Sequence, residues 1–335
     1  MKPGELNPFH QLDFQTIKKR LGRKVERVEW LILLLVFSFL GLLCLFQNDS
    51  IYPVDLVNYL NAPHRNFEQF FYLPVWVPLL ALLEKLPLRY AWLIWGTLNI
   101  LGFWFAWRTF GGPIWSWLTA SLFFVIFYGQ ISGVLAGGLA AYWIALSLNN
   151  WFLIGVSACI VSSKYIWGVP LVLIFSYLAG NSKRIYLRSL VVFSCIVFSF
   201  ILIYPEWAVG FIQRFYASPP NDQASISLWR YIGPISLLLW AVPFLLPIKK
   251  VERLALVFFA TPLVVPYFQP HDLLVWFAFP LGIIPLFSNA TFVLLSNFGL
   301  SGLRFLAIIP FSLYTLGILR YCNLLSPKLV NKCNR

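Results

Sequence analysis

The apolar run WLILLLVFSFLGLLCLF at residues 30–46 decides the fold class of this chain. It contains no charged side chain, and its length approaches the roughly 20 residues that a helix needs to cross the hydrocarbon core of a bilayer. The basic segment KKRLGRKVER stands directly before it, at residues 18–27, and such segments favour the cytoplasmic face of a membrane. The sequence therefore predicts a first transmembrane helix that follows a cytoplasmic basic tail at residues 1–29.

Similar apolar runs recur along the whole chain. Of the 335 residues, 60% are hydrophobic and 11% are charged, whereas an ordinary soluble domain carries about 25% charged residues. Because a soluble fold of this size could not bury so much apolar surface, lipid must cover most of it. We therefore predict an all-α fold, a polytopic transmembrane helical bundle of about 10–12 spans. The expected parts are a seven-span module at 30–204 with an outer loop at 48–71, a second outer loop at 205–230, C-terminal transmembrane helices at 231–320 and a basic tail at 321–335.

The positions of Lys and Arg predict a topology. Seven crossings are expected before the second outer loop, with the second at residues 72–83 and the sixth, a long one, at 151–179. With the tail inside, segments 84–89, 181–188 and 248–253 fall in the cytoplasm, and both large polar stretches fall outside. The C-terminal basic residues also favour the cytoplasm, which requires either a re-entrant segment or two short spans within 290–319. We expect a multi-pass protein of the cell membrane with a cytoplasmic N-terminus.

The net charge of +13 does not indicate a nucleic-acid partner. The basic residues form short clusters beside apolar runs, where they orient a membrane protein, and no basic stripe with interleaved aromatic residues is present. The five cysteines contain no CxxC pair, and no HExxH-like ligand spacing occurs. We therefore expect no cofactor, and we expect that a metal is not required.

Acids and histidines gather on the face predicted to lie outside. A group of carboxylates and imidazoles just above a bilayer suits acid–base chemistry on a lipid headgroup, although solvated loop charges explain each of them singly. Lys164 differs, because it lies in the middle of an apolar run. It would either pair with a lipid phosphate or reach another span. The outer group comprises Asp49, Asp55, His64, Glu68, Glu206, Asp222, His271 and Asp272.

Several short motifs occur in an order that resembles glycosyltransferase family 87, of the C-type membrane glycosyltransferase superfamily. YPVDLVNYLNA at residues 52–62 places an Asp and then an aromatic residue after the first span, and FFYLP at 70–74 opens the second. Tyr128-Gly129-Gln130 is similar to the family's Gly-Gln at a helix end. The late segment ATPLVVPYFQPHD, residues 260–272, has the aromatic residue and the Asp of its last motif. Gly155, Lys164 and Pro170 match a further spacing, and the resemblance covers roughly residues 30–285.

The resemblance implies a polyprenyl-phosphate sugar as donor, with mannose favoured, and a glycolipid or glycan hydroxyl as acceptor. A carboxylate would deprotonate that hydroxyl, which attacks the anomeric carbon with inversion while the lipid phosphate leaves. Asp55 is the predicted base, with Asp49 as its rival because Pro53 and Val54 depart from the family's usual neighbours. His271 is predicted to share the catalytic task. The predicted substrate-binding residues are Asp49, Arg65, Tyr72, Gln130, Lys164 and Asp272.

Two other classes of function remain open at the level of sequence. A multi-span transporter or lipid flippase would bury its acids and bases within the spans, whereas most ionisable residues here lie at span ends. A non-catalytic membrane assembly protein would share the fold and lack a working carboxylate.

Overall fold

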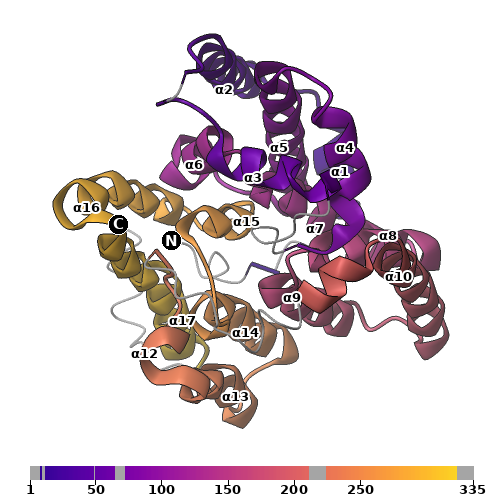
Figure 1. Cartoon of the computed structure of the whole chain (residues 1–335). Helices are drawn as coiled ribbons and strands as arrows, with labels where there is room; N and C mark the ends of the chain where they lie inside the picture. The colour runs from indigo at the N-terminus through magenta and orange to yellow at the C-terminus, as the bar shows by residue number, and fades with distance from the viewer. Residues whose placement is uncertain (1–7, 10–11, 49, 65–71, 211–223, 323–335) are drawn as a thin grey trace.

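The computed structural model describes residues 8–9, 12–48, 50–64, 72–210 and 224–322. Within these ranges every regular element is an α-helix or a 3-10 helix, and the only β-type pairing is the isolated bridge between Asn48 and Ile51. The helices surround a common interior in Figure 1. The predicted all-α class is confirmed.

The α-helices are α1 (Phe14–Gly22), α2 (Arg27–Leu45), α3 (Val54–Leu60), α4 (Val77–Leu83), α5 (Leu88–Phe110), α6 (Ala120–Tyr128), α7 (Ser132–Ser147), α8 (Trp151–Ser162), α9 (Tyr165–Ala179), α10 (Lys183–Ile203), α12 (Trp229–Ile232), α13 (Leu238–Leu245), α14 (Lys250–Val264), α15 (Leu273–Phe277), α16 (Ala290–Phe298) and α17 (Ile308–Tyr321). Short 3-10 helices connect them, of which η2 (Pro74–Trp76), η5 (Pro270–Asp272) and η7 (Gly299–Ala307) matter for the site.

Three helical stretches in the described part of the chain are long and apolar enough to cross a membrane: Arg27–Leu45, Lys183–Ile203 and Ile284–Tyr321. The pair α6 and α7, bent by 111°, is a fourth candidate. Four further apolar helical stretches are shorter: Pro74–Leu83, Trp151–Ser162, Tyr165–Ala179 and Trp229–Leu245. The chain is thus a helical protein with several candidate membrane spans, fewer by this measure than the expected 10–12.

Helices α5 and α7 form a closely packed pair in the centre of the bundle. An added Cβ at Gly133 would lie 2.3 Å from the carbonyl oxygen of Asn99, so only glycine permits this approach. The amide oxygen of the fully buried Asn99 accepts the backbone N–H of Gly133 at 3.0 Å. Small residues with an interhelical hydrogen bond are typical of helix packing within membranes. This pair carries the N-terminus of α7 toward the site described below.

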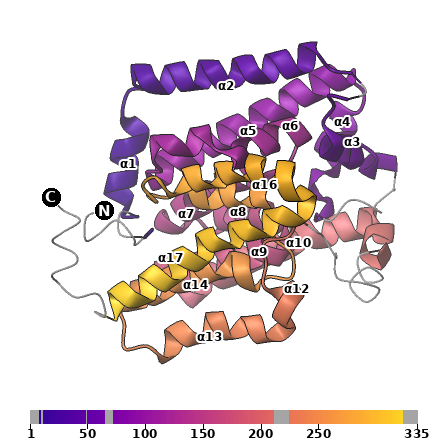
Figure 2. The ribbon, with the colours of Figure 1, turned by 90° about the vertical axis from the view of Figure 1, so that its left-hand side faces the viewer.

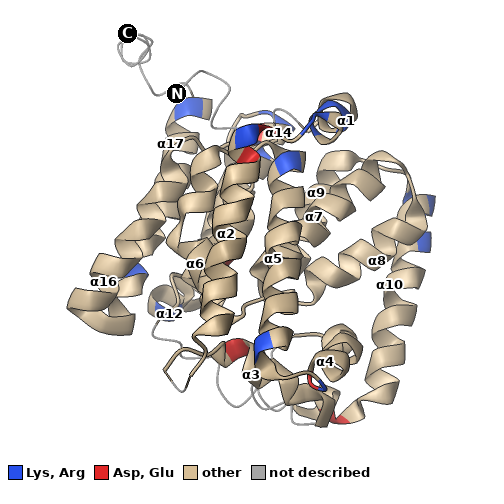
Figure 3. Cartoon of the chain, turned by 90° about the horizontal axis from the view of Figure 1, so that it is seen from above, with Lys and Arg blue, Asp and Glu red and all other residues tan. Residues whose placement is uncertain are grey.

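Most charged side chains lie toward the two ends of the bundle, and basic side chains at the start of α10 and beside α16 lie between them (Figure 3). At one end, which we call the α1 end, Arg108 at the end of α5 donates to the carbonyl oxygens of Arg20 and Arg23. There the Trp143 indole donates to the carbonyl of Leu12 at 3.0 Å. The opposite end, which we call the α3 end, holds α3 and α4.

The predicted second crossing, at residues 72–83, does not occur. Helix α4 has only seven residues, and Glu84 at its end lies 2.5 Å from His64 in the outer loop. Segment 84–89 therefore lies at the α3 end, which contradicts the placement expected from its Lys and Arg. The physical reason is that the run is too short to span and contains two prolines, Pro74 and Pro78, each in the first turn of a short helical piece.

The run 151–179, expected to be one long span, is a helical hairpin of α8 and α9. An added Cβ at Gly168 would lie 2.0 Å from the carbonyl oxygen of Val161, a contact that no continuous helix makes. Beyond α9, Asn181 donates to the Leu146 carbonyl and to Asn149, both at 2.8 Å, so the hairpin begins and ends at the α1 end. The chain thus lacks one expected traverse of the bundle at 72–83 and makes one extra traverse in the α8–α9 hairpin. Helix α10 therefore still runs from the α1 end to the α3 end, as the sequence predicts.

The C-terminal helices return to the α1 end. The chain reverses at Gly299, where φ is +61°, and an added Cβ at Gly302 would lie 2.7 Å from the carbonyl oxygen of Leu294. Helix α17 then runs along α14 (Figure 2), with Tyr321 within electrostatic range of Glu252 at the start of α14. Segments 181–188 and 248–253 thus lie at the same end as α1, as their basic residues predict.

Candidate functional site

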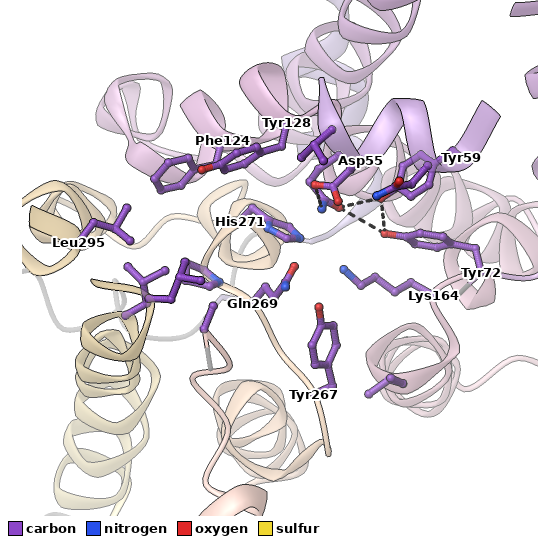
Figure 4. Close-up of a pocket in the computed structure, with 18 residues that line it drawn as sticks. Asp55, Tyr59, Tyr72, Phe124, Tyr128, Lys164, Tyr267, Gln269, His271 and Leu295 are labelled. Carbon is purple, nitrogen blue, oxygen red and sulfur yellow. Dashed lines mark hydrogen bonds between the residues drawn. The ribbon is translucent and has the colours of Figure 1, made fainter. Parts of the chain in front are cut away.

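A cavity of about 440 Å³ opens at the α3 end of the bundle. Figure 4 shows that it gathers side chains from segments far apart in the sequence. Its polar lining residues are Asp55, Asn58, Tyr59, Tyr72, Gln130, Lys164, Tyr267, Gln269 and His271, and its more apolar ones include Phe124, Tyr128, Leu295, Leu300 and Leu303.

Asp55 lies in the first turn of α3 and is held by Gln130. The side-chain amide of Gln130 donates to Oδ2 of Asp55 at 2.5 Å. The amide oxygen of the same Gln130 accepts from the hydroxyls of Tyr59 at 3.0 Å and Tyr72 at 3.3 Å. Both tyrosines and Gln130 are buried, whereas Asp55 is half-buried and faces the cavity. The network therefore fixes the carboxylate at the cavity wall.

Gly129 explains why α3 can lie so close to Gln130. Its φ of +71° belongs to the left-handed region that favours glycine, and it ends α6. An added Cβ there would lie 2.7 Å from Cβ of Leu56 on α3. The indole of Trp95 on α5 donates to the Gly129 carbonyl at 2.8 Å and anchors the turn. The Tyr-Gly-Gln motif therefore forms the surface against which α3, the helix that carries Asp55, packs.

Lys164 stands at the turn of the α8–α9 hairpin. Its ammonium lies 2.6 Å from Oδ1 of Asp272, which also accepts from Ser132 Oγ at 2.9 Å. The neighbouring Ser163 accepts the backbone N–H of Leu73 at 2.9 Å through its carbonyl, which joins the outer loop to the hairpin. Lys164 is thus not in the middle of a helix, as its run in the sequence implied, but at a break in one.

His271 comes from η5, the short helix after α14. Its Nε2 lies 3.6 Å from Oδ1 of Asp272, and the ring lines the same cavity as Asp55. The backbone N–H of Gln269 donates to Oδ2 of Asp272 at 3.2 Å, so Asp272 closes the start of η5 while it pairs with Lys164. An imidazole, an ammonium and a carboxylate from three distant segments thus share one cavity.

The opposite side of the cavity is apolar. Phe124 and Tyr128 of α6 stack at 5.4 Å between ring centroids, and Leu295, Leu300 and Leu303 of α16 and η7 complete this wall. In Figure 4 the labelled members of this wall lie on the side away from Lys164 and Tyr72. The cavity therefore has a polar half and an apolar half, which matches a ligand with a charged head and a hydrocarbon part.

The two tyrosines keep their protons. Burial raises the pKa of Tyr59 well above its ordinary value, and neighbouring Tyr72 and Asp55 raise it further. Burial also raises the pKa of Tyr72, although nearby Lys164 opposes this change. Their hydroxyls therefore remain hydrogen-bond donors over the whole working pH range.

The structure brings together five of the eight residues predicted for the site: Asp55, His271, Tyr72, Gln130 and Lys164 line one cavity. Asp49 and Arg65 lie outside the described residues. Asp272 is fully buried and pairs with Lys164, and it does not line the cavity. In the described ranges no group of three His, Cys, Asp or Glu side chains is placed to hold a metal ion.

Sequence reasoning missed Tyr59, Tyr267 and Gln269 as lining residues. Tyr59 is the aromatic residue of the YPVDLVNYLNA motif, one helical turn after Asp55, and that spacing places both on one face of α3. Tyr267 and Gln269 alternate with buried residues just before η5, which is the signal that would have found them.

Fold and site together define a class: a helical membrane protein with a half-polar, half-apolar cavity at one end of its bundle. No protein-family model, curated protein or solved structure matches the chain.

Proposed function

We propose that this protein is a membrane glycosyltransferase. It would transfer a hexose, with mannose favoured by the family resemblance, from a polyprenyl-phosphate donor to a lipid or glycan acceptor on the extracytoplasmic face. The observation that carries the proposal is that Asp55 and Lys164 face one cavity, which also has an apolar wall. A base, a cation and a surface for hydrocarbon are the three features that such a transfer requires.

Asp55 is the proposed general base. It takes the proton of the acceptor hydroxyl while the oxygen attacks the anomeric carbon, and the bond between that carbon and the phosphate oxygen breaks with its electron pair on the phosphate. Sugar transfer then proceeds with inversion. Asp55 suits this role because it is half-buried, faces the cavity and is already hydrogen-bonded as an acceptor.

Lys164 is the proposed partner of the donor phosphate. An ammonium group has three donors, and Asp272 and its surroundings leave part of the group facing the cavity. His271 lines the same cavity and would bind the phosphate or the acceptor. The ion pair with Asp272 holds the ammonium in place before the donor arrives, which reduces the entropy lost on binding.

A transporter is less well supported. In the described part of the chain the buried ionisable side chains lie at helix ends or breaks, where they hold segments together or line the cavity. These residues are Glu29, Arg108, Lys164, His271 and Asp272.

The test is sugar transfer by the purified protein in detergent or nanodiscs, from a radiolabelled polyprenyl-phosphate hexose to a lipid acceptor fraction. We expect Asp55→Asn to lower the rate at least about 100-fold, the usual contribution of a general base. The matched control is Glu84→Gln, which removes another carboxylate at the same end that does not line the cavity. Transfer by Asp55→Asn at the wild-type rate would remove Asp55 from the mechanism.

A further inference from the structure

We propose that Tyr59 and Tyr72 act through Gln130 as positioning residues that keep Asp55 ionised and fixed at the cavity wall. This inference rests on the proposed function, because it explains how the base is kept ready for the acceptor proton. It starts from an asymmetry of the Gln130 side chain, which has an oxygen on one side and an NH₂ group on the other.

The orientation of the Gln130 amide follows from its neighbours. Its oxygen lies 3.0 Å from the Tyr59 hydroxyl and 3.3 Å from that of Tyr72, and the two hydroxyls lie 3.0 Å apart. Hydroxyl groups that keep their protons donate to that oxygen, so the NH₂ group must point to Asp55. A carboxylate accepts such a bond, whereas a protonated carboxyl is satisfied better by the opposite orientation, in which its O–H donates to the amide oxygen.

The protonation of Asp55 and the orientation of Gln130 are therefore coupled. Protonating Asp55 favours a flipped amide, but the flip would turn the NH₂ group toward two hydroxyls and cost the amide oxygen both of its donors. Gln130 is 5% exposed, so water does not readily replace those lost bonds. Through Gln130, the tyrosines thus disfavour the protonated form of Asp55.

Other titratable groups also lie around Asp55. Lys164 also favours the ionised carboxylate, because it lies within electrostatic range of it. The titratable groups that line the cavity with Asp55 or lie next to its lining are Tyr59 on α3, Tyr72 before η2, Tyr128 on α6, Lys164 between α8 and α9, Tyr267 before η5, and His271 and Asp272 in η5. None of these is altered by changing Gln130 itself.

The variants are Tyr59→Phe, Tyr72→Phe, the double change, and Gln130→Leu, each measured for transfer across pH. In the profile of transfer rate against pH, we expect the acidic limb of the double variant to move to higher pH by about one unit. We expect a shift at least as large for Gln130→Leu, because that change removes a charge-assisted hydrogen bond to Asp55. Tyr142→Phe is the control, since it removes a buried hydroxyl bonded to Ser176, away from the site. Its acidic limb should coincide with that of the wild type.

A uniform fall in rate with an unchanged acidic limb would overturn the inference, because a merely structural role lowers activity equally at all pH values. The single Tyr72→Phe change keeps the test decisive if the double variant does not fold, as it removes the longer of the two bonds. If the acidic limb of the pH profile is the same as in the wild type for both Tyr72→Phe and Tyr59→Phe, that result also contradicts the proposal.

A second measurement separates this inference from the proposed function. Infrared titration of the wild type against Asp55→Asn isolates the carboxyl band of Asp55 without any substrate. We expect the band of the protonated acid to appear at higher pH in the double tyrosine variant than in the wild type. Wild-type protein without transferase activity would defeat the proposed function, whereas identical infrared titrations would defeat the positioning role alone.

Discussion

The ammonium of Lys164 lies 2.6 Å from a carboxylate oxygen of Asp272, although 108 positions separate the two residues in the chain. Both are buried, and together they join the turn of the α8–α9 hairpin to the start of η5. Ser132 at the start of α7 donates to the same oxygen. This contact ties three segments together beneath the cavity and determines where its cation stands.

Removing one partner of this pair should be costly. Asp272→Asn leaves the Lys164 charge buried without its counter-charge, for which about 3–5 kcal/mol of destabilisation is usual. We expect a clearly lower melting temperature in detergent, measured by tryptophan fluorescence. Adding Lys164→Met to that variant should restore much of the lost stability, because no unpaired charge remains. Equal melting temperatures for Asp272→Asn and the wild type would contradict the pairing.

The contact between Gly129 and α3 should not tolerate a side chain at position 129. Gly129→Ala combines the backbone strain of a positive φ, about 1–2 kcal/mol, with a clash against Leu56 that costs a similar amount or more. Gly180→Ala is a matched control, because Gly180 also has a positive φ, +66°, but nothing lies within 4 Å of its added Cβ. Gly129→Ala should therefore lower the melting temperature more than Gly180→Ala does. Hydrogen exchange should become faster in α3 in Gly129→Ala only.

Helix α1 should detach from the bundle when Arg108 is replaced. Arg108 donates to two carbonyls at the end of α1 and lies 4.0 Å from Glu29, which is itself almost fully buried. Arg108→Met leaves Glu29 with fewer positive neighbours, at a cost of about 3 kcal/mol or more. Limited trypsin digestion should then cleave faster at Lys18 and Lys19. Arg89→Met, at the exposed other end of α5, should leave that cleavage rate unchanged.

The two ends of the bundle should be accessible from opposite sides of the membrane. Lys85→Cys lies at the α3 end and Lys183→Cys at the α1 end, and both positions are exposed. On a background in which the five native cysteines are replaced by serine, an impermeant maleimide added to intact cells should label position 85 but not position 183. Labelling of position 183 should require permeabilised membranes. Labelling of both positions in intact cells would contradict the bundle's two-ended arrangement.

Much of the fold could be predicted from local sequence. The run at 30–46 forms α2, and the basic segments at 181–188 and 248–253 lie at the same end as α1. The prediction of a span at 72–83 is wrong because the run is apolar but short, and Pro74 and Pro78 stand within it. The prediction of one long span at 151–179 is wrong because the tight turn at Ser163 and Lys164 leaves almost no polar gap between two apolar helices.

The site was predicted in part, through single residues rather than their contacts. Asp55, Gln130 and Lys164 each stood out in the sequence, but nothing there indicated that Gln130 bonds Asp55 or that Asp272 pairs with Lys164. Such contacts form when helices that are far apart in the sequence pack together, and no periodicity within a single sequence indicates which distant helices do so.

By itself, the sequence determined that the chain is helical and needs lipid around it, because composition and run length act locally on every segment. Only the tertiary structure decided which runs turn back, which acid faces the cavity and which is hidden behind a lysine. The physical reason is that these outcomes depend on close contacts at glycines and on buried hydrogen bonds between segments, which form only when distant helices meet.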